Sequence, residues 1–471
     1  MRALSLFCFS MVASTMLVAQ TMNLSDPVYV NQEVGSSNRP HITLVDGEPI
    51  IMFTRNSLGK RVYINRQSNG EWLGEQQVSP EGINFQVGNR LGPAIDSYGQ
   101  TVYIAYIIES NPKQIAVQRS IDGGATFSDL IVAHELGDNL SEFIDIKVLP
   151  DGNPTIAFLH YGTGWADAKQ AIIRSYDGGE TFADLITIDD FPCECCSPAI
   201  ISDEEKYGVL YRDNDADIRT FKISTSDNST DIFSTPIETD PTNWEVNSCP
   251  VSPGDGFFMG DTLYSTWMSM PGELTQIFMS KTHLGEEQIL DWSVVESSQD
   301  SESQNHPRID GDSEFQLIAW EEYRDSKKDI LAVLVQNGVY QTSVSLAEGD
   351  SIGHKESVDI AYDKDAKIFH VVYRNKNEND VVYRSFTPSG LSIDAIEELS
   401  ITLYPNPATS VIRIDSELGG ESFYTVYNTL GKVVLTGDYT GMISIEELEQ
   451  GNYFIELVDE SNRYRSSFVK Q

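Results

Sequence analysis

The nine residues Arg174-Ser175-Tyr176-Asp177-Gly178-Gly179-Glu180-Thr181-Phe182 occur almost unchanged a second time, as Arg119-Ser120-Ile121-Asp122-Gly123-Gly124-Ala125-Thr126-Phe127. An apolar alternating run precedes each copy and a short apolar run follows it, and the Asp-Gly-Gly turn needs the positive φ that glycine adopts easily. In such a turn the aspartate can accept backbone N–H bonds, the threonine hydroxyl can bond across, and the phenylalanine can pack beneath. The stretch therefore predicts a repeated β-hairpin.

Both copies resemble the Asp-box of the bacterial neuraminidase repeat, Ser-x-Asp-x-Gly-x-Thr-Phe. The matching residues are Ser120, Asp122, Gly124, Thr126 and Phe127 in one copy and Ser175, Asp177, Gly179, Thr181 and Phe182 in the other. In that family the box lies at the periphery of a propeller blade. The resemblance therefore implies a structural role for these residues rather than a catalytic one.

A larger unit recurs along the chain, with an Xaa-Pro or equivalent start, an apolar strand, a turn and a second apolar strand. The starts are Arg39-Pro40, Gly92-Pro93, Phe143-Ile144, Ser197-Pro198, Cys249-Pro250, His306-Pro307 and Ser357-Val358. The second strands are 49–53, 102–106, 154–158, 207–211, 263–267, 315–320 and 368–373. Copies spaced by about 50 residues predict an all-β fold, a seven-bladed β-propeller over residues 20–388.

Two details of that ring stay open at this point. The sialidase family that the Asp-boxes resemble is usually six-bladed, so six blades are the alternative. The seventh unit has no convincing fourth strand of its own, and the apolar segment Val28 to Val30 could supply it. Pairing the first segment with the last blade would close the ring and leave no open sheet edge.

The pattern changes after residue 388. A linker is expected over 389–400, and the short alternating strands of 401–471 predict a small Ig-like β-sandwich. Tyr404-Pro405-Asn406-Pro407, the Tyr427-Asn428 to Gly431-Lys432 turn, the Gly451 to Leu457 strand and the Lys470-Gln471 end resemble the C-terminal sorting domain of the type IX secretion system. The resemblance implies outer-membrane export through that machinery, followed by cell-surface attachment or release. An accessory adhesive sandwich is the alternative.

The beginning of the chain indicates the same destination. Residues 1–19 have the basic start, the apolar middle and the small-residue exit of a secretory signal peptide. The apolar stretch is too short to span a membrane, and no later stretch is long enough for a transmembrane segment. We therefore expect a secreted protein or one attached to the outer-membrane surface.

The charge balance excludes one class of partner. Asp and Glu number 71 against 32 Lys and Arg, a formal net charge of -39, which repels the phosphate backbone of a nucleic acid. An acidic surface that keeps an exported protein soluble explains this composition, and Ca²⁺ bound at carboxylate-rich loops is the alternative. No other cofactor is expected from the charge pattern.

Four cysteines remain once the signal peptide with Cys8 is removed: Cys193, Cys195, Cys196 and Cys249. Both groups precede inner strands of neighbouring blades, so we expect Cys249 to lie close to the other three. An even number in an oxidising compartment predicts two disulfides, whose pairing the sequence leaves open. A zinc or copper(I) site made of thiolates is an alternative. A nucleophilic cysteine is a third, although no histidine lies nearby in the sequence.

The cysteines belong to a larger constellation. Cys193-Glu194-Cys195-Cys196, then Tyr211-Arg212-Asp213 with Ile218-Arg219, then Trp244 to Pro250 resemble an exported sialidase-like propeller group with Cys-x-Cys-Cys, Tyr-Arg-Asp and Trp-x-x-Asn-x-Cys-Pro. The resemblance localises a site without naming its chemistry. The predicted ligand-binding residues are Arg39, Arg212, Asp213, Arg219, Trp244, Asn247 and Arg308.

Sialidase chemistry would need an arginine cluster for the substrate carboxylate, a carboxylic acid, and a tyrosine activated by glutamate. The candidate catalytic residues are Arg212, Asp213, Asp217 and Arg219, and Tyr211 with Glu321 or Glu322 could be the nucleophile pair. Each of these charges could equally form an interblade ion pair.

The sequence thus predicts a sialidase-like propeller, secreted or at the cell surface, that binds a glycan or a surface protein at the channel mouth near blades four and five. The alternatives are an exo-glycosidase of sialidase type and a protein with a cysteine-bound metal. Fold alone does not license an activity, so whether the protein is an enzyme stays open.

Overall fold

The computed structural model describes residues 22–32, 37–56, 59–88, 91–163, 167–295, 302–324, 326–347, 353–388, 399–400, 403–414, 422–428, 433–458 and 463–471. The predicted signal peptide and most of the predicted linker lie outside these residues. The described part of the chain contains no apolar helix of the length that a membrane crossing requires. Two compact units, Met1–Pro388 and Ser389–Gln471, make up the chain.

The first unit consists of antiparallel sheets of four or five strands, seven of them among the described residues. The first three are β2 (Ser37–Val45), β3 (Glu48–Arg55), β4 (Arg61–Ser68), β5 (Glu71–Trp72) and β6 (Gln76–Gln77); β7 (Ala94–Tyr98), β8 (Thr101–Ile108), β9 (Gln114–Ser120) and β10 (Ile131–Glu135); and β11 (Leu140–Val148), β12 (Pro154–Tyr161), β13 (Lys169–Arg174) and β14 (Ile186–Asp189). The next two are β15 (Ala199–Ser202), β16 (Lys206–Arg212), β17 (Phe221–Asp227) and β18 (Ile237–Glu238); and β19 (Asp255–Met259), β20 (Thr262–Ser269), β21 (Gln276–His283) and β22 (Gln288–Val294). The last two are β23 (Ser303–Gly311), β24 (Phe315–Arg324), β25 (Lys327–Gln336), β26 (Val339–Tyr340) and β27 (Val344–Ser345); and β28 (Lys355–Asp363), β29 (Ile368–Asn375) and β30 (Asp380–Phe386) with β1 (Val28–Tyr29). The seven predicted second strands lie within β3, β8, β12, β16, β20, β24 and β29, so that part of the repeat is confirmed.

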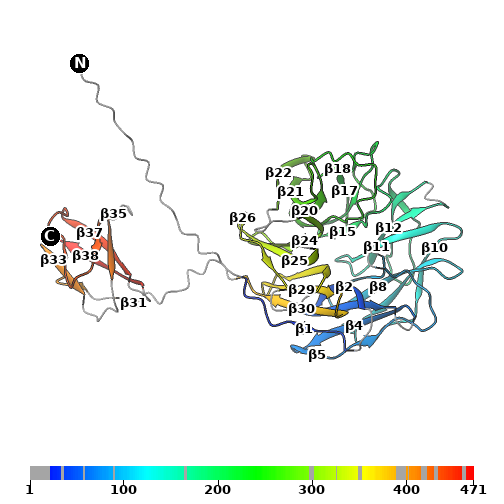
Figure 1. Cartoon of the computed structure of the whole chain (residues 1–471), viewed down its shortest axis with the longest axis horizontal. Helices are drawn as coiled ribbons and strands as arrows, with labels where there is room; N and C mark the ends of the chain where they lie inside the picture. The colour runs from blue at the N-terminus through cyan, green and yellow to red at the C-terminus, as the bar shows by residue number, and fades with distance from the viewer. Residues whose placement is uncertain are drawn as a thin grey trace, which may run out of the picture. The chain divides into compact units, whose positions relative to one another are not determined.

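These sheets follow one another around a ring (Figure 1). The first strand of each sheet contacts the first strand of the next, in the order β2, β7, β11, β15, β19, β23, β28 and back to β2. Strand β1 pairs with β30 of the last sheet, with Val28 opposite Tyr383 and Tyr29 opposite Val382. The prediction that the first segment supplies the missing strand is therefore confirmed, and the unit is a β-propeller.

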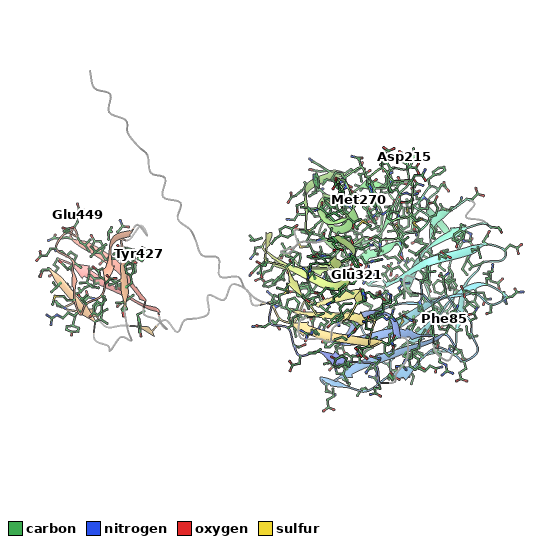
Figure 2. The ribbon with its side chains drawn as sticks, viewed as in Figure 1. Phe85, Asp215, Met270, Glu321, Tyr427 and Glu449 are labelled. Carbon is green, nitrogen blue, oxygen red and sulfur yellow. A yellow bond between two sulfur atoms is a disulfide. The ribbon has the colours of Figure 1, made fainter. Side chains whose placement is uncertain are left out.

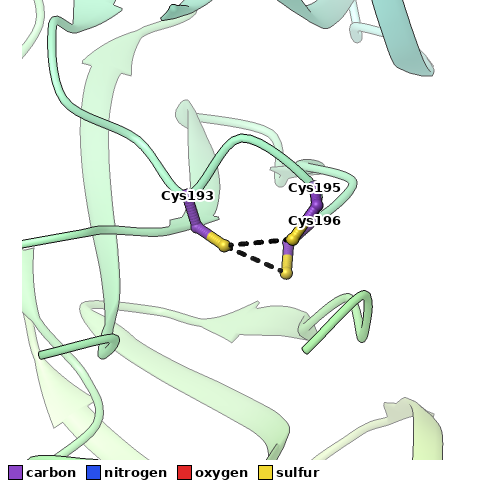
Figure 3. Close-up of side chains that lie close together, drawn as sticks. All are labelled: Cys193, Cys195 and Cys196. Atoms are coloured by element: carbon purple, nitrogen blue, oxygen red, sulfur yellow. Dashed lines mark hydrogen bonds between the residues drawn. The ribbon is translucent and has the colours of Figure 1, made fainter. Parts of the chain in front are cut away.

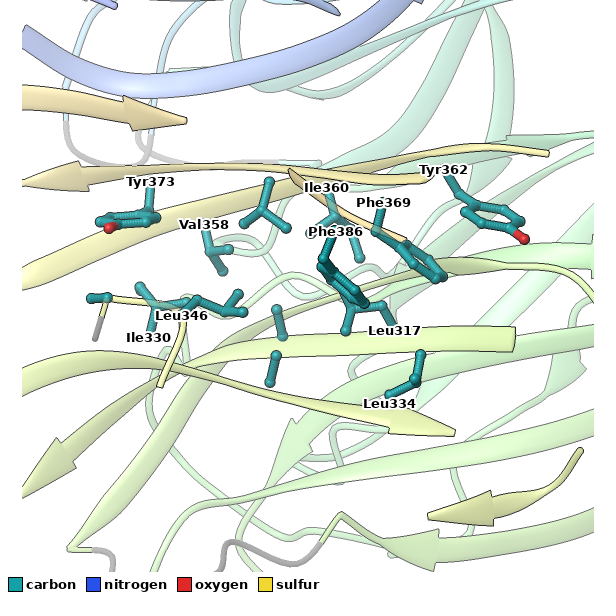
Figure 4. Close-up of a cluster of buried hydrophobic side chains, with 14 of the residues drawn as sticks. Leu317, Ile330, Leu334, Leu346, Val358, Ile360, Tyr362, Phe369, Tyr373 and Phe386 are labelled. Carbon is teal, nitrogen blue, oxygen red and sulfur yellow. The ribbon is translucent and has the colours of Figure 1, made fainter. Parts of the chain in front are cut away.

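The core lies between neighbouring sheets, because each sheet buries both faces. In β8, Tyr103, Ala105 and Ile107 pack toward the third sheet, while Val102, Ile104 and Tyr106 pack toward the first. Alternate side chains of a strand point to opposite faces, which is why the middle strands read as continuous apolar runs. Figure 4 shows the equivalent layer between the last two sheets, where Leu317 and Leu334 face Ile360 and Phe369.

Carboxylates at the centre of the ring bond one sheet to the next. In each case the side chain of an inner strand accepts a backbone N–H from the following inner strand, at 2.7 to 3.0 Å: Asp96 from Val148, Asp145 from Ile200, Asp255 from Ile309, Asp310 from Tyr362, and Asp359 from Ile42. The last of these joins the seventh sheet to the first. Thr43 Oγ1 and Ser97 Oγ, 2.6 Å apart, link the first sheet to the second.

The two Asp-Gly-Gly turns lie between the third and fourth strands, and their internal hydrogen bonds are those expected. Asp122 accepts the Thr126 N–H at 2.9 Å and its hydroxyl at 2.6 Å, and Asp177 accepts the same groups of Thr181 at the same distances. These threonine bonds, with those from the preceding serines, lower the pKa of both aspartates to about 2. Phe127 and Phe182 pack against the cores below.

The second unit also consists of β-strands. One sheet contains β31 (Leu399–Ser400), β38 (Arg463–Lys470), β37 (Gly451–Val458), β34 (Phe423–Asn428) and β35 (Val433–Asp438), in that order, and a smaller one contains β32 (Leu403–Tyr404), β33 (Val411–Ile414) and β36 (Ile443–Ser444). Ile412, Val426, Ile443 and Leu457 are buried in its own core.

The central carboxylates predict an unusual pH dependence of stability. Burial raises the pKa of Asp145 to about 6 and that of Asp255 to about 7, above the usual pKa of an aspartate, although the accepted N–H bonds and Arg308 lower both. A raised carboxyl pKa adds stability below the unfolded pKa that is lost as the pH rises through the folded pKa. Because both carboxyls keep partial solvent contact, we expect a loss of about 1 to 2 kcal/mol between pH 5 and 8.

Replacing Asp255 by Asn keeps an acceptor for the Ile309 N–H and removes the charge. Urea unfolding at pH 5, 6, 7 and 8 should show a shallower decline for Asp255→Asn than for the wild type. Asp291→Asn, at an exposed position of β22, serves as the control. Equal slopes in Asp255→Asn and the wild type would contradict the assignment.

Candidate functional site

A cavity of about 170 Å³ opens at the centre of the propeller, lined by residues of the first, third, sixth and seventh sheets and of the segments that precede the fourth and fifth sheets. Its walls are the starts of inner strands and the segments beside them. The lining residues are Arg39, Pro40, His41, Phe143, Cys195, Ser197, Val251, Pro253, His306, Arg308, Glu321, Lys328, Glu356, Ser357, Val358 and Lys376. Figure 2 labels Glu321 within the propeller.

The backbone around the cavity is strained in a repeated way. Arg39, Phe143, Val251, His306 and Ser357 have φ between 46° and 57°, although none of them is glycine. In four of the five, the strand pair shows a register shift at that residue, which marks a β-bulge. Left-handed residues of these types persist only where the surrounding structure holds them, and they cluster at binding and catalytic sites. The same local distortion in five sheets thus shapes one cavity.

The Asp359 carboxylate holds Arg308 directly and Arg39 through His41. Arg39 Nε donates to His41 Nε2 at 3.1 Å, and His41 Nδ1 lies 3.2 Å from Asp359 Oδ2, so the ring is a neutral tautomer with its proton on Nδ1. Arg308 Nε lies 3.2 Å from Asp359 Oδ1. Burial and then the charge of Arg308 lower the pKa of Arg39 to about 10. Two guanidinium groups therefore share one wall of the cavity.

Glu321 anchors a second group of lining residues, Lys328, His306 and Ser357. Its Oε2 lies 2.8 Å from Lys328 Nζ and 3.3 Å from His306 Nδ1, and its Oε1 accepts the Ser357 N–H at 2.8 Å. Burial opposes ionisation, but His306 and Lys328 lower the pKa of Glu321 well below its usual range. His306 Nδ1 lies near the Glu321 carboxylate but is not oriented for a hydrogen bond to it. Neither buried ring nitrogen of His306 has a hydrogen-bond partner among the described residues.

The lining is cationic in an acidic protein. The lining residues include the cations Arg39, Arg308, Lys328 and Lys376 and the carboxylates Glu321 and Glu356, and Asp359 beside them pairs with Arg308. Glu356 is itself bonded by buried Arg374 at 2.7 Å. Within a chain of net charge -39, this local excess indicates a site for an anionic group.

The cysteine cluster adjoins the cavity through Cys195. A disulfide joins Cys195 to Cys249, as expected from the proximity of the two groups. Cys193 and Cys196 are buried free thiols, with Cys193 Sγ 3.6 Å from Cys196 Sγ and 3.5 Å from Cys195 Sγ (Figure 3). Of the two predicted disulfides the structure contains one, because the other two sulfurs contact each other without bonding.

The pKa values of the two free thiols are shifted in opposite directions. The hydrogen bond to Cys196, together with burial, raises the pKa of Cys193. Burial also raises that of Cys196, but the Cys193 bond and the charge of Arg212 outweigh it and lower the pKa. Cys196 is therefore the more acidic of the two thiols.

The other predicted site residues do not line the cavity. Arg212 is buried and donates to the carbonyl groups of Arg219 and Met268, and Asp213 pairs with Lys222. Arg219 donates to Cys193 Sγ at 2.9 Å.

Trp244 packs in a hydrophobic core, Asn247 is exposed, and Asp217 lies on a partly exposed loop. Tyr211 donates to Asp189 at 2.9 Å and is not paired with Glu321 or Glu322. Of the predicted ligand-binding residues, the cavity brings together Arg39 and Arg308.

Sequence reasoning missed Lys328, Glu356 and Lys376, and it named Glu321 only as a possible partner of Tyr211. Arg39 and His306 open their repeats as Arg39-Pro40 and His306-Pro307, so aligning the repeats on these starts would have indicated a shared wall. Glu321 and Lys328, in the second and third strands of their sheet, have no comparable sequence signal, because strand pairing places them at the cavity.

Comparison with known proteins identifies one end of the chain. Residues 402–471 match the secretion system C-terminal sorting domain. The predicted type IX sorting domain is confirmed, and the protein is exported. No curated protein matches the chain.

Solved structures are similar in fold. An ulvan lyase, described as a new family of polysaccharide lyase bound to -[GlcA(1-4)Rha3S]-, is 10% identical with a TM-score of 0.51, over 75% of this chain and 94% of its own. An α-L-arabinofuranosidase from Fusarium graminearum has a TM-score of 0.43 at 10% identity, over 64% and 96%. The subtype N11 neuraminidase-like protein of A/flat-faced bat/Peru has 0.44 at 13% identity, over 67% and 92%. At these identities the likeness concerns the fold alone.

The anchor role of Glu321 can be measured. Glu321→Gln should lower the free energy of unfolding at pH 7 by about 2 to 4 kcal/mol, because it removes a buried carboxylate from Lys328 and from the Ser357 N–H. A lowered carboxyl pKa adds stability above the unfolded pKa, and acidification through the folded pKa removes it. The difference from the wild type should therefore shrink toward pH 3, as chemical denaturation at both pH values would show.

Glu314→Gln is the matched control, because the ion pair of Glu314 with Lys367 is solvent-exposed. We expect it to change stability by less than about 1 kcal/mol. An equal effect of the two variants would contradict the anchor role.

Proposed function

We propose that the propeller is a non-catalytic binding module that recognises a carboxylated glycan at the central cavity. The observation that carries this proposal is the pair Arg39 and Arg308, which the His41 and Asp359 side chains hold on one wall. Guanidinium groups match carboxylates geometrically and bind them with charge-assisted hydrogen bonds. The cationic lining supplies the attraction that the acidic remainder of the protein lacks.

The size of the cavity suggests which part of a glycan enters. At about 170 Å³ the cavity is smaller than the clefts that bury drug-sized ligands. It suits one acidic sugar at the end of a chain, with the carboxylate toward the arginines.

Binding without turnover agrees with the lining groups. No tyrosine is among the described residues that line the cavity, so a sialidase-type nucleophile has no candidate there. Glu321 is held ionised by His306 and Lys328, which makes it unsuited to act as a general acid. An exo-glycosidase of sialidase type is therefore the less favoured function.

The remaining parts of the proposal concern architecture and address. We interpret the seven sheets as seven propeller blades, and the second unit as a small sandwich that the type IX secretion machinery recognises. The glycan ligand then lies outside the cell, where the exported propeller is either attached to the surface or released.

The proposal predicts ligand binding that depends on both arginines. Isothermal titration with a glucuronate-terminated or sialylated oligosaccharide should show one site per chain, with affinity falling as salt rises. Arg308→Gln and Arg39→Gln should each weaken binding at least tenfold, because each removes a charge-assisted bond to the carboxylate. The reduced or esterified sugar should bind no better to the wild type than to the variants.

Controls separate binding from folding and from catalysis. Arg61→Gln, in β4 and outside the cavity, should bind as the wild type does, and thermal unfolding reports whether each variant is folded. Methylumbelliferyl glycosides should release no fluorophore. Turnover would favour the exo-glycosidase, and equal binding by Arg61→Gln, Arg308→Gln and the wild type would overturn the cavity assignment.

A further inference from the structure

The cysteine cluster has the spacing of a metal site. Cys193 Sγ lies 3.5 Å from Cys195 Sγ and 3.6 Å from Cys196 Sγ, and all three sulfurs lie within 4.8 Å of one another (Figure 3). Cys249 is bonded to Cys195, so its sulfur belongs to the same group. Zinc–sulfur bonds of about 2.3 Å at tetrahedral angles place two ligand sulfurs about 3.8 Å apart. The observed separations are close to that value.

Two buried arginine side chains, Arg212 and Arg219, lie beside the sulfur atoms. Arg212 is 1% exposed, donates to two carbonyl oxygens at 3.1 and 2.7 Å, and forms no ion pair among the described residues. Asp240, whose Oδ1 atom accepts the Thr242 hydroxyl, interacts with the charge of Arg212 and offsets part of it. A thiolate beside a buried guanidinium adds favourable charge pairing.

Arg219 contacts one of the sulfur atoms directly. Its Nη1 donates to Cys193 Sγ at 2.9 Å, and its Nε donates to the Val246 carbonyl at 3.1 Å. Glu194 lies 3.6 Å from Nη1 at the more exposed side of the guanidinium. Hydrogen bonds from such groups to thiolate ligands orient them and tune the affinity of metal sites.

We propose that Cys193, Cys195, Cys196 and Cys249 together bind one zinc-class divalent cation, with Arg212 and Arg219 offsetting its charge. Four thiolates and a divalent cation carry a net charge of -2, which two guanidinium groups neutralise. In the form with the Cys195–Cys249 disulfide the sulfurs supply less negative charge, and Glu194, 3.6 Å from Arg219 Nη1, is the carboxylate that pairs with that arginine. The form with the Cys195–Cys249 disulfide is then the metal-free, oxidised state.

Interconversion of the two states needs a reductant of the thiol class. Two R–SH molecules reduce the Cys195–Cys249 bond and become R–S–S–R, which leaves four cysteine thiols. The thiols release their protons to solvent as the cation binds. A bound cation would hold the Cys193 to Cys196 loop to the Cys249 segment, at the junction of the fourth and fifth sheets beside the cavity.

The test uses the full chain with Cys8→Ser, so that the cluster contains every remaining cysteine. After anaerobic reduction with a phosphine, titration with Cd²⁺ should give a sulfur-to-cadmium charge-transfer band that saturates at one ion per chain. Zn²⁺ should displace the Cd²⁺ and protect all four thiols from alkylation. Competition with a chromophoric chelator then measures the Zn²⁺ affinity.

Variants distinguish this site from incidental chelation by nearby thiols. Cys193→Ser, Cys196→Ser and Cys249→Ser should each lose the one-ion endpoint. Arg219→Gln keeps every ligand and should weaken Zn²⁺ binding 10- to 100-fold, the range reported for groups that support metal ligands. Arg61→Gln, a distant arginine, should leave the affinity unchanged.

Three outcomes would overturn the proposal. These are absence of ion binding by the reduced and folded chain, full affinity in Cys249→Ser, and equal affinity in Arg219→Gln and Arg61→Gln. Circular dichroism of each variant shows whether the propeller is folded. Binding of a glycan at the cavity is not part of this test, so the two proposals stand or fall separately.

Discussion

The propeller depends on carboxylates that each accept a backbone N–H from the next sheet. These bonds lie at the centre of the ring, where the inner strands converge, and the bond from Asp359 to Ile42 joins its two ends. A buried acceptor that lost its donor would cost the desolvation of a carboxylate. The bonds therefore fix the angular position of each sheet relative to its neighbour, while the apolar layers between sheets supply the bulk of the cohesion.

The candidate site follows from that arrangement. Asp359 both closes the ring and holds Arg308 and His41, so one carboxylate connects the scaffold to the cationic wall of the cavity. Bulges at the start of the inner strands turn Arg39, His306 and other residues into left-handed conformations around the same space. The strain is distributed over several sheets, each of which is held by its neighbours, which keeps the cavity shaped in the absence of a ligand.

The junction between the fourth and fifth sheets is built differently. Instead of a carboxylate accepting a backbone N–H, the described structure has the Cys195–Cys249 disulfide and the Arg212 bond to the Met268 carbonyl there. At this junction Arg219 donates to Cys193 Sγ and also lies 3.6 Å from Glu194. This contrast is the physical reason for treating the cysteines as more than covalent reinforcement.

Local pattern determined much of this protein. The repeated Asp-Gly-Gly turns, the apolar second strands and the unpaired segment at Val28 predicted the strands and the closure of the ring, because turn chemistry and alternation act over a few residues. The last 70 residues likewise had a recognisable sorting pattern. The cavity was decided only by tertiary structure: strand pairing within the sixth sheet places Glu321 and Lys328 beside His306, and Arg212 is buried because neighbouring strands enclose it. Burial and charge pairing depend on distances between segments far apart in the chain, which a linear pattern does not contain.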